Sequence, residues 1–360
     1  MAENESIETA PLVLMQSSPH IVRKDNTSII MSTVLISLLP VTVWGIVIFG
    51  IAAFLNVAVS VASAICAEAL FRRITKQDIR IKDCSAALTG LLLALVIPPT
   101  TPLWMTALGS IFAVVVVKEF FGGLGCNVFN PALGGRAFML TSFPVALTTW
   151  AVPSGLGGKA ALDAASSASH NALDAATMAS PLGVVKQGNF WADPFGAVGD
   201  TFVANGLSAT NGAGDVIKTL FLGNHAGCIG ETSIFLILIG GIFLLLRGVI
   251  DWRAPVALIV TSFVASAALG MDPIFSILSG GIVFGAVFMA TDYTSAPVTD
   301  WGKVIFGIGA GLLAVLIRKY GNYPEGASYG ILIMNMATPF LNRIRHRKYG
   351  FVKPVKKAAK

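Results

Sequence analysis

The sequence carries little charge. Only 12% of its 360 residues are Asp, Glu, Lys or Arg, whereas soluble domains carry about 25%. Hydrophobic residues make up 54% of the chain, and the mean hydropathy is +0.75 over the full length. These values exclude an ordinary soluble enzyme, a disordered protein and a disulfide scaffold. They predict a polytopic membrane protein, because apolar runs of about 20 residues span the roughly 30 Å hydrocarbon core.

Cysteine and catalytic motifs are also scarce. The four cysteines, Cys66, Cys84, Cys126 and Cys228, form no CxxC pair, which argues against a four-thiolate zinc or iron–sulfur site within this chain. The four histidines lack ligand spacing, and HExxH, P-loop and GxSxG motifs are absent. We therefore predict no metal ion and no catalytic side chain. The polar first 25 residues predict no cleavable signal peptide.

Apolar segments follow one another along the chain. Ten are predicted as membrane helices, five on each side of a less hydrophobic stretch: 28–49, 51–71, 86–97, 103–121, 130–147, 229–246, 254–271, 274–290, 304–317 and 327–341. Pro98–Pro99, Pro131 and Gly134–Gly135 predict interruptions in these helices. The predicted units are an N-terminal segment (1–27), a five-helix half (28–149), an outer loop (150–228), a second half (229–342) and a tail (343–360).

Basic residues predict the orientation. They concentrate between Arg72 and Lys82 and in the tail from Arg343 to Lys360, which has eight Lys or Arg and no acid. Such clusters beside apolar segments are typical of cytoplasmic anchors rather than nucleic-acid sites. With ten spans, both termini are expected in the cytoplasm and residues 150–227 outside. Arg318 and Lys319 fit this orientation less well, since their loop falls outside.

The two halves contain a weak internal repeat. Leu88–Trp104 resembles Leu278–Trp301 in layout, and each is followed by a long apolar helix and a Gly-rich bend. Five helices per half is an odd number, so the second half is expected to be inverted in the membrane. Inverted repeats with broken helices place a functional site at their interface.

Acidic residues near membrane depth are candidates for an ion path, because ionisable groups there are rare. Asp292 lies between Thr291 and Thr294, whose oxygens suit Na⁺, and its carboxylate also suits H⁺. Glu231 and Glu325 are expected on the outer side. Glu68 belongs to the same group of acids. Glu119 adjoins Lys118 and is expected to form an interfacial ion pair.

A polar motif begins the helix after the first Gly-rich bend. Asn130 and Pro131 predict a helix N-terminus, with Asn as the cap and Pro in the first position. Arg136 follows within the same helix and is costly in lipid. Two alternatives stay open: a site for an anionic or polar ligand or an ion path, and a buried structural arginine paired with a helix end.

Longer motifs give a specific resemblance. The chain resembles, throughout its length, the D subunits of Rnf complexes, the ion-translocating ferredoxin:NAD oxidoreductases. The matching segments are SSPHI (17–21), PPTTPLWM (98–105), VVVKEFFGGLGCNVFNPALGGRAF (115–138), TLFLGNHAGCIGET (219–232), LSGGIVFGAVFMATDYTSAPVT (278–299) and YPEGASYGILIMNMATPFLNR (323–343). The B subunit of the sodium-pumping NADH:quinone oxidoreductase is a poorer match.

The resemblance implies a cofactor. In this family FMN is joined by a phosphoester to the threonine that ends the motif D-x-x-[ST]-x-A-T, and Thr210 matches that threonine. Ser208 and Ala209 match the residues before it, whereas Ala204 and Leu207 replace the acid and the hydroxyl residue expected upstream. FMN would carry the electrons. The resemblance also allows a second, noncovalent flavin, such as riboflavin, in a pocket beside Asn130 and Arg136.

The resemblance further implies a urea-transporter-like plan, a bacterial inner-membrane location, partner subunits A, B, C, E and G, and a flavin transferase. The chain lacks nucleotide-binding and iron–sulfur motifs, so ferredoxin and NAD are expected to react on other subunits. Membrane lipid is an expected partner and nucleic acid is not. Two alternatives remain, the B-type subunit of the quinone-reducing pump and a flavin-free channel or transporter for a small solute.

Overall fold

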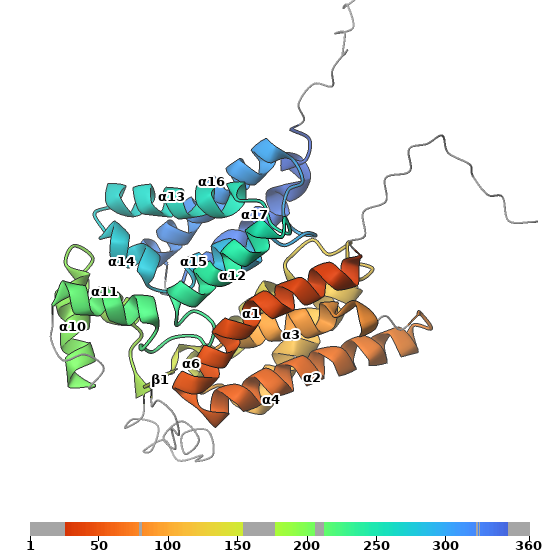
Figure 1. Ribbon diagram of the computed structural model, residues 1–360, viewed down its shortest axis with the longest axis horizontal. Helices are drawn as coiled ribbons and strands as arrows, with labels where there is room; N and C mark the ends of the chain where they lie inside the picture. The colour runs from red at the N-terminus through yellow and green to blue at the C-terminus, as the bar shows by residue number, and fades with distance from the viewer. Residues whose placement is uncertain are drawn as a thin grey trace, which may run out of the picture.

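The computed structural model describes residues 26–78, 81–153, 177–205, 212–321, 323 and 325–344. The first half of the chain contains α1 (Thr27–Phe49), α2 (Ile51–Ile74), the 3₁₀ turn η1 (Ile81–Asp83), α3 (Ser85–Leu95), α4 (Leu103–Phe112), the π-helix η2 (Ala113–Glu119), α5 (Pro131–Ser142) and α6 (Pro144–Thr148). Figure 1 shows α1 to α4 as one packed block in the lower part of the molecule.

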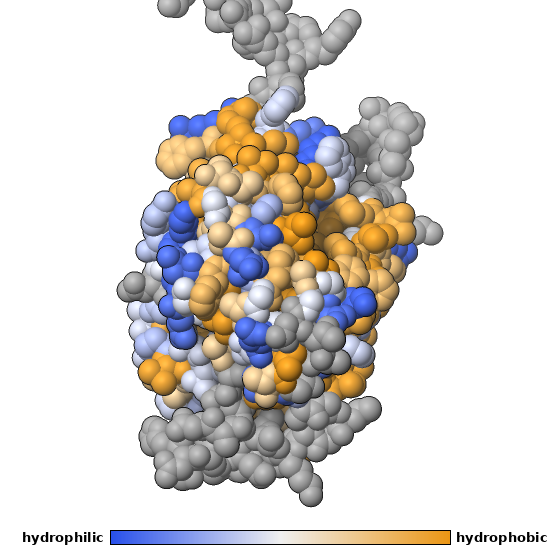
Figure 2. Space-filling view, turned by 90° about the vertical axis from the view of Figure 1, so that its left-hand side faces the viewer, coloured by the Kyte–Doolittle hydropathy of each residue, from blue (hydrophilic) through white to orange (hydrophobic). Residues whose placement is uncertain are grey.

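A middle segment follows. It consists of β1 (Trp150–Ala151), β2 (Thr177–Met178), α9 (Pro181–Gly188), α10 (Pro194–Ala204) and α11 (Ala213–Leu222). The two short strands pair antiparallel. The three helices share an apolar cluster that includes Leu182, Val198, Phe202 and Leu220. Helices α10 and α11 form one end of the molecule, and hydrophilic residues are scattered among hydrophobic ones over that end (Figures 1 and 2).

The second half contains α12 (Ile234–Leu246), α13 (Arg253–Ala268), α14 (Pro273–Leu278), α15 (Ile282–Phe284), the π-helix η3 (Gly285–Met289), α16 (Asp300–Tyr320) and α17 (Ala327–Leu341). These helices lie together in the upper part of Figure 1. Each of the ten predicted apolar segments therefore contains helix, and the protein is an all-helical membrane protein apart from the two-residue strands. Among the described residues, α1, α2 and α16 are long and apolar enough to cross a membrane, and α3, α12, α13 and α17 are shorter apolar helices.

Helix interruptions occur at some of the predicted places. Helix α3 ends at Leu95, just before Pro98 and Pro99. The segment predicted as one helix over 274–290 is divided at Ser279–Gly281, where Gly280 has a positive φ of 65°. The carbonyl group at the end of α3 still has a partner, because the Gly230 backbone N–H donates to Leu95 O over 2.7 Å. Such pairing is what makes a broken helix tolerable at membrane depth.

The prediction of an interruption at Gly134 and Gly135 was wrong. Both lie inside α5. A Cβ on Gly134 would lie 2.9 Å from Val117 Cγ2, and one on Gly135 would lie 2.8 Å from Ala113 Cβ. These glycines therefore let α5 pack closely against η2 instead of breaking the helix.

Helices α13 and α16 approach closely through two glycines one turn apart. A Cβ on Gly307 would lie 2.6 Å from Ala254 O, and a Cβ on Gly311 would lie 2.6 Å from Leu258 O. We expect Gly307→Ala to lower the free energy of unfolding by about 1–3 kcal/mol, because backbone cannot move aside as a side chain can. Chemical unfolding in detergent measures this. Gly214→Ala is the control, since its Cβ would meet nothing within 4 Å; equal effects of the two changes would contradict the prediction.

Candidate functional site

The helix α5 begins as predicted. The Asn130 side chain accepts hydrogen bonds from the backbone N–H groups of Ala132 and Leu133, and Pro131 occupies the first helical position. The Asn130 Nδ2 group also donates to Met289 O over 3.4 Å. Both polar atoms of the Asn130 amide therefore have partners within the chain. The Nδ2 bond joins the start of α5 in the first half to the end of η3 in the second.

A cavity with several polar residues in a mainly apolar lining lies beside this helix start. Its polar lining includes Ser85, Thr89, Lys118, Asn127 and Asp292, and apolar side chains from α1, α3, α12 and η3 complete the wall. We call it the Asp292 cavity. Residues of both halves of the chain line it.

Asp292 is held in place by hydroxyl groups. Its Oδ2 accepts from Thr294 Oγ1 over 3.0 Å and from Ser295 Oγ over 2.8 Å. Asn127 Nδ2 donates to Thr294 Oγ1 over 2.7 Å. The group thus combines one carboxylate with several neutral oxygen atoms, a donor set that suits a hard cation or a proton.

A second polar group lies around Arg136, further along α5. Arg136 forms an ion pair with Glu325, which stands just before α17. Its Nη1 donates to Ser328 Oγ over 3.0 Å, and its Nη2 contacts Cys228 Sγ at 3.7 Å. Arg136 is 6% exposed and Glu325 is 7% exposed. The pair joins the two halves of the chain, since its members are 189 positions apart in sequence.

The connection between α11 and α12 supplies the rest of this group. The Cys228 backbone N–H donates to Glu231 Oε1 over 3.2 Å, and Cys228 Sγ contacts Val96 O at 3.1 Å. Ligand atoms of Cys228, Glu231 and Glu325 all lie within 4.8 Å of one another. A small cavity adjoins them, lined by Ser180, Pro181, Leu182, His225, Ala226, Glu231, Gly280 and Glu325. We call it the Glu231 cavity.

The sequence-predicted residues therefore separate into two groups. The structure brings Glu231 and Glu325 together with Arg136, whereas Asp292 and Asn130 line the other cavity. Asn130 and Arg136 belong to one helix but not to one pocket. Arg136 is buried, and its partners are the Glu325 carboxylate and the Ser328 hydroxyl rather than the free backbone groups of a helix end. Ser208 and Thr210 lie outside the described residues, in the connection between α10 and α11.

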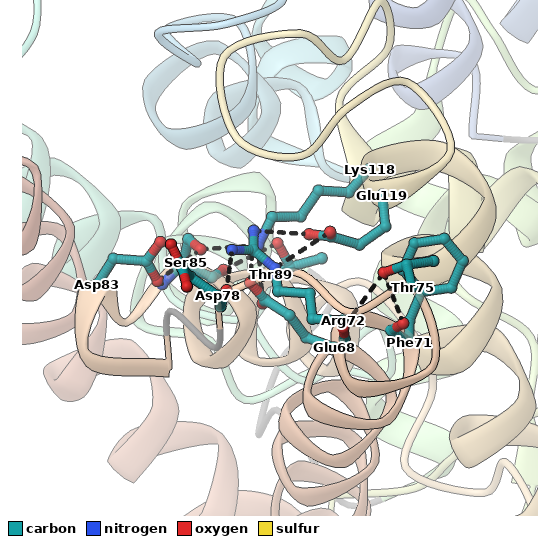
Figure 3. A network of polar contacts seen from close by, with 10 residues as sticks. All are labelled: Glu68, Phe71, Arg72, Thr75, Asp78, Asp83, Ser85, Thr89, Lys118 and Glu119. Carbon is teal, nitrogen blue, oxygen red and sulfur yellow. Dashed lines mark hydrogen bonds and ion pairs between the residues drawn. The ribbon is translucent and has the colours of Figure 1, made fainter. Parts of the chain in front are cut away.

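A buried network of charges borders the Asp292 cavity (Figure 3). Lys118 Nζ donates to Glu68 Oε2 over 2.9 Å and to Ser85 Oγ over 2.7 Å. Arg72 binds both oxygens of Glu119, at 3.1 and 3.2 Å, and contacts Glu68 Oε1 at 3.2 Å. Glu119 was expected to form an ion pair and does so, although its partner is Arg72 and not the adjacent Lys118.

Sequence reasoning missed several members of these groups. Lys118 was noted only as a neighbour of Glu119, and His225 and Cys228 carried no motif. Arg318 was predicted in an outer loop, yet it is fully buried and donates to Ser276 O and Ser279 O. Lys118 and Ser85 are 33 positions apart, and Arg318 and Ser279 are 39 positions apart. No local pattern reveals contacts over such separations.

Comparisons with known proteins place the chain in a family. Residues 14–350 match the NQR2, RnfD, RnfE family. The chain is 40% identical over 348 residues to the D subunit of the Na(+)-translocating ferredoxin:NAD(+) oxidoreductase complex of Acetobacterium woodii, covering 96% of this chain and 98% of that one. It is 39% identical over 349 residues to the proton-translocating counterpart of Clostridium ljungdahlii, covering 95% of each. The chain therefore belongs to the NQR2, RnfD, RnfE family.

Proposed function

We propose that the chain is the D subunit of an Rnf complex, an ion-translocating ferredoxin:NAD oxidoreductase. The observation that carries this proposal is the similarity to two D subunits over at least 95% of each chain. The chain is not catalytic alone, because it has no nucleotide-binding or iron–sulfur motif. Ferredoxin and NAD would react on the partner subunits A, B, C, E and G.

The chain's part in electron transfer would be to hold FMN on Thr210. When bound, this flavin supplies one- and two-electron chemistry. Thr210 lies between the end of α10 at Ala204 and the start of α11 at Ala213. A hydroxyl in a connection between helices can reach a flavin transferase, whereas one inside a packed helix cannot. Asn130 and Arg136, the residues predicted for a second flavin, do not line one pocket. We therefore propose only the covalent flavin.

The arrangement of the helix ends supports ten crossings in two inverted halves. Contacts near one set of helix ends include Ser28 with Lys82, Asn127 with Thr294, and Val298 with Asn342. Contacts near the opposite ends include Trp44 with Leu222 and Lys319 with Leu269. The first set lies beside the basic residues of the α2–α3 loop, which favours the cytoplasm for that side and for both termini. Arg318 and Lys319 are compatible with a place on the opposite side, because both side chains donate to backbone carbonyl groups of the chain.

The two cavities support a path for Na⁺ or H⁺. The Asp292 cavity lies at the start of α5, and the Glu231 cavity adjoins the Arg136 group, about one and a half turns further along the helix. Buried apolar residues, including Leu133 and Phe284, lie in the core of the same region. An ion would therefore bind at one polar cavity and reach the other only when the packing between the halves changes, as alternating access requires.

Asp292 provides a test of this path. In vesicles that contain the whole complex, we expect Asp292→Asn to lower the number of ions moved per electron pair by about tenfold or more, because the charge that attracts the ion is lost. Asp300→Asn is the matched control, since Asp300 is an exposed partner of Arg253. An unchanged ratio in Asp292→Asn would remove Asp292 from the path.

Purification of the intact complex tests membership. The proposal expects co-purifying subunits with several iron–sulfur clusters and flavin on this chain. A B-type subunit of the quinone-reducing pump would instead support quinone reduction by NADH. A solute channel would purify without flavin, and either result would contradict the proposal.

A further inference from the structure

The Glu231 cavity is small and is lined by four separate parts of the chain, one of which is Gly280 between α14 and α15. The start of α9 contributes Ser180 and Leu182, the α11–α12 connection contributes His225 and Glu231, and Glu325 stands before α17. The cavity measures about 10 Å³. A single water molecule needs roughly 10–15 Å³ by this measure. The space therefore fits one water molecule.

His225 has an unused acceptor in this cavity. The side chain is only 2% exposed, and its Nδ1 atom has no hydrogen-bond partner among the described residues. Burial lowers the pKa of His225 to about 4, and a hydrogen bond with the Thr219 backbone opposes this shift only in part. The ring is therefore neutral at physiological pH. In the neutral tautomer that carries its proton on Nε2, the unpartnered Nδ1 keeps a lone pair that can accept a hydrogen bond.

The charges around the cavity are balanced. Arg136, from α5, pairs with Glu325. Arg318, from α16, lies behind Gly280, since a Cβ on that glycine would be 2.8 Å from Arg318 Nη2. A Cβ on Gly281 would lie 3.0 Å from Glu231 Oε2. Two guanidinium groups thus face two carboxylates.

Few other titratable groups lie nearby. Cys228 contacts the two acids, and Lys186, from α9, binds the carbonyl groups of Gly321 and Tyr323. No net negative charge is left to hold a metal cation in the part of the site that the structure describes. A proton, by contrast, can move between these groups without a coordination shell.

We propose that the Glu231 cavity holds one water molecule and passes protons, with Glu231 and Glu325 as the exchanging acids and His225 as the residue that positions the water. This inference rests on the proposed function and names the ion that passes this cavity. The water accepts a hydrogen bond from protonated Glu231 and donates to His225 Nδ1 and to Glu325. Three hydrogen bonds are typical of a buried water.

The transfer is balanced within these groups. The Glu231 carboxyl gives its proton to the water, and the water gives one of its own protons to the Glu325 carboxylate. The water molecule is regenerated, and no oxidant or further reactant is needed. Protonated Glu325 no longer carries the charge that holds Arg136, so the contact between α5 and the start of α17 weakens in that state.

Variants of the whole complex in inverted membrane vesicles test the proposal. The measured quantity is the number of protons taken up per NADH formed, followed with a pH-sensitive dye. Glu231→Gln cannot carry the proton, and His225→Leu cannot accept from the water. We expect each change to lower this ratio by about tenfold or more, since each removes one member of the relay.

His225→Asn is the matched control. The asparagine Oδ1 can replace the Nδ1 lone pair, although asparagine does not titrate in this range. We expect a ratio within about twofold of the wild type, because the position of one acceptor is what matters. A merely structural role of the imidazole would predict no such difference between asparagine and leucine. In-gel flavin fluorescence and thermal stability show whether each variant is assembled.

Three results would overturn the proposal. His225→Leu and His225→Asn could give the same ratio, or Glu231→Gln could pump protons as the wild type does. The wild-type complex could also take up ²²Na⁺ in a manner insensitive to a protonophore, with Glu231→Gln abolishing that uptake. That third result would leave the proposed function intact, whereas a wild-type complex without ferredoxin:NAD activity would remove the function itself.

Discussion

Thr210→Ala is expected to abolish the flavin fluorescence of the denatured chain, and Ser208→Ala is expected to retain it. The phosphoester needs a hydroxyl at the acceptor position, and alanine has none. Both residues lie in the same connection between α10 and α11, so a general disturbance of this connection would affect the two variants alike. Illuminated gels of the denatured protein report the covalent flavin directly.

We also expect Thr210→Ala to lower the ferredoxin:NAD activity of the complex strongly. If the FMN on this chain lies on the electron path, ferredoxin:NAD activity of the complex falls to background in Thr210→Ala, because no side chain of this protein can replace a flavin. Ser208→Ala is again the control. Fluorescence that persists in Thr210→Ala would place the flavin elsewhere, and full activity without fluorescence would remove this flavin from the path.

We expect Lys118→Met to destabilise the protein strongly. Lys118 is 1% exposed and neutralises Glu68, which is fully buried. Without the ammonium group, Arg72 alone faces the two carboxylates of Glu68 and Glu119, and the network gains a net negative charge. Removing one partner of a buried ion pair costs about 3–5 kcal/mol. Chemical unfolding in detergent measures the loss.

A double variant separates the ion pair from packing. Lys118→Met with Glu68→Leu removes both charges, so we expect it to regain most of the stability that the single change loses. Lys218→Met is the exposed control, because Lys218 and Asp215 form a pair at the surface and such pairs contribute little. A single-variant loss no larger than that of the control would contradict the account of the network.

Local sequence patterns predicted where helices begin and end better than they predicted which distant residues come into contact. The cap at Asn130 and the end of α3 before Pro98 follow from the chemistry of adjacent residues, and the structure has both. Gly134 and Gly135 were misread, because glycine can either break a helix or let two helices approach. Only the neighbouring Val117 and Ala113 decide between these roles, and the sequence does not say which residues become neighbours.

The residues around the two cavities were also easier to single out from the sequence than to assign to their contacts. Scarce charge made Asp292, Glu231 and Glu325 easy to single out, and each of the three lines a cavity. The partition into two cavities was not predictable, since it depends on which distant segments pack around Asn130 and around Arg136. The adjacent residues Lys118 and Glu119 were expected to pair, yet successive helical residues point in different directions. They therefore have different partners, Glu68 and Arg72.

The central claim is that this chain carries a covalent FMN as part of an Rnf complex. Mass spectrometry of the chain from the purified complex tests it most directly. Trypsin releases a peptide from Gln187 to Lys218, which contains Thr210 together with Ser208 and Thr201. The account predicts an FMN-sized addition to this peptide, with fragment ions that place it on Thr210. An unmodified peptide, or an addition on another residue, would contradict it.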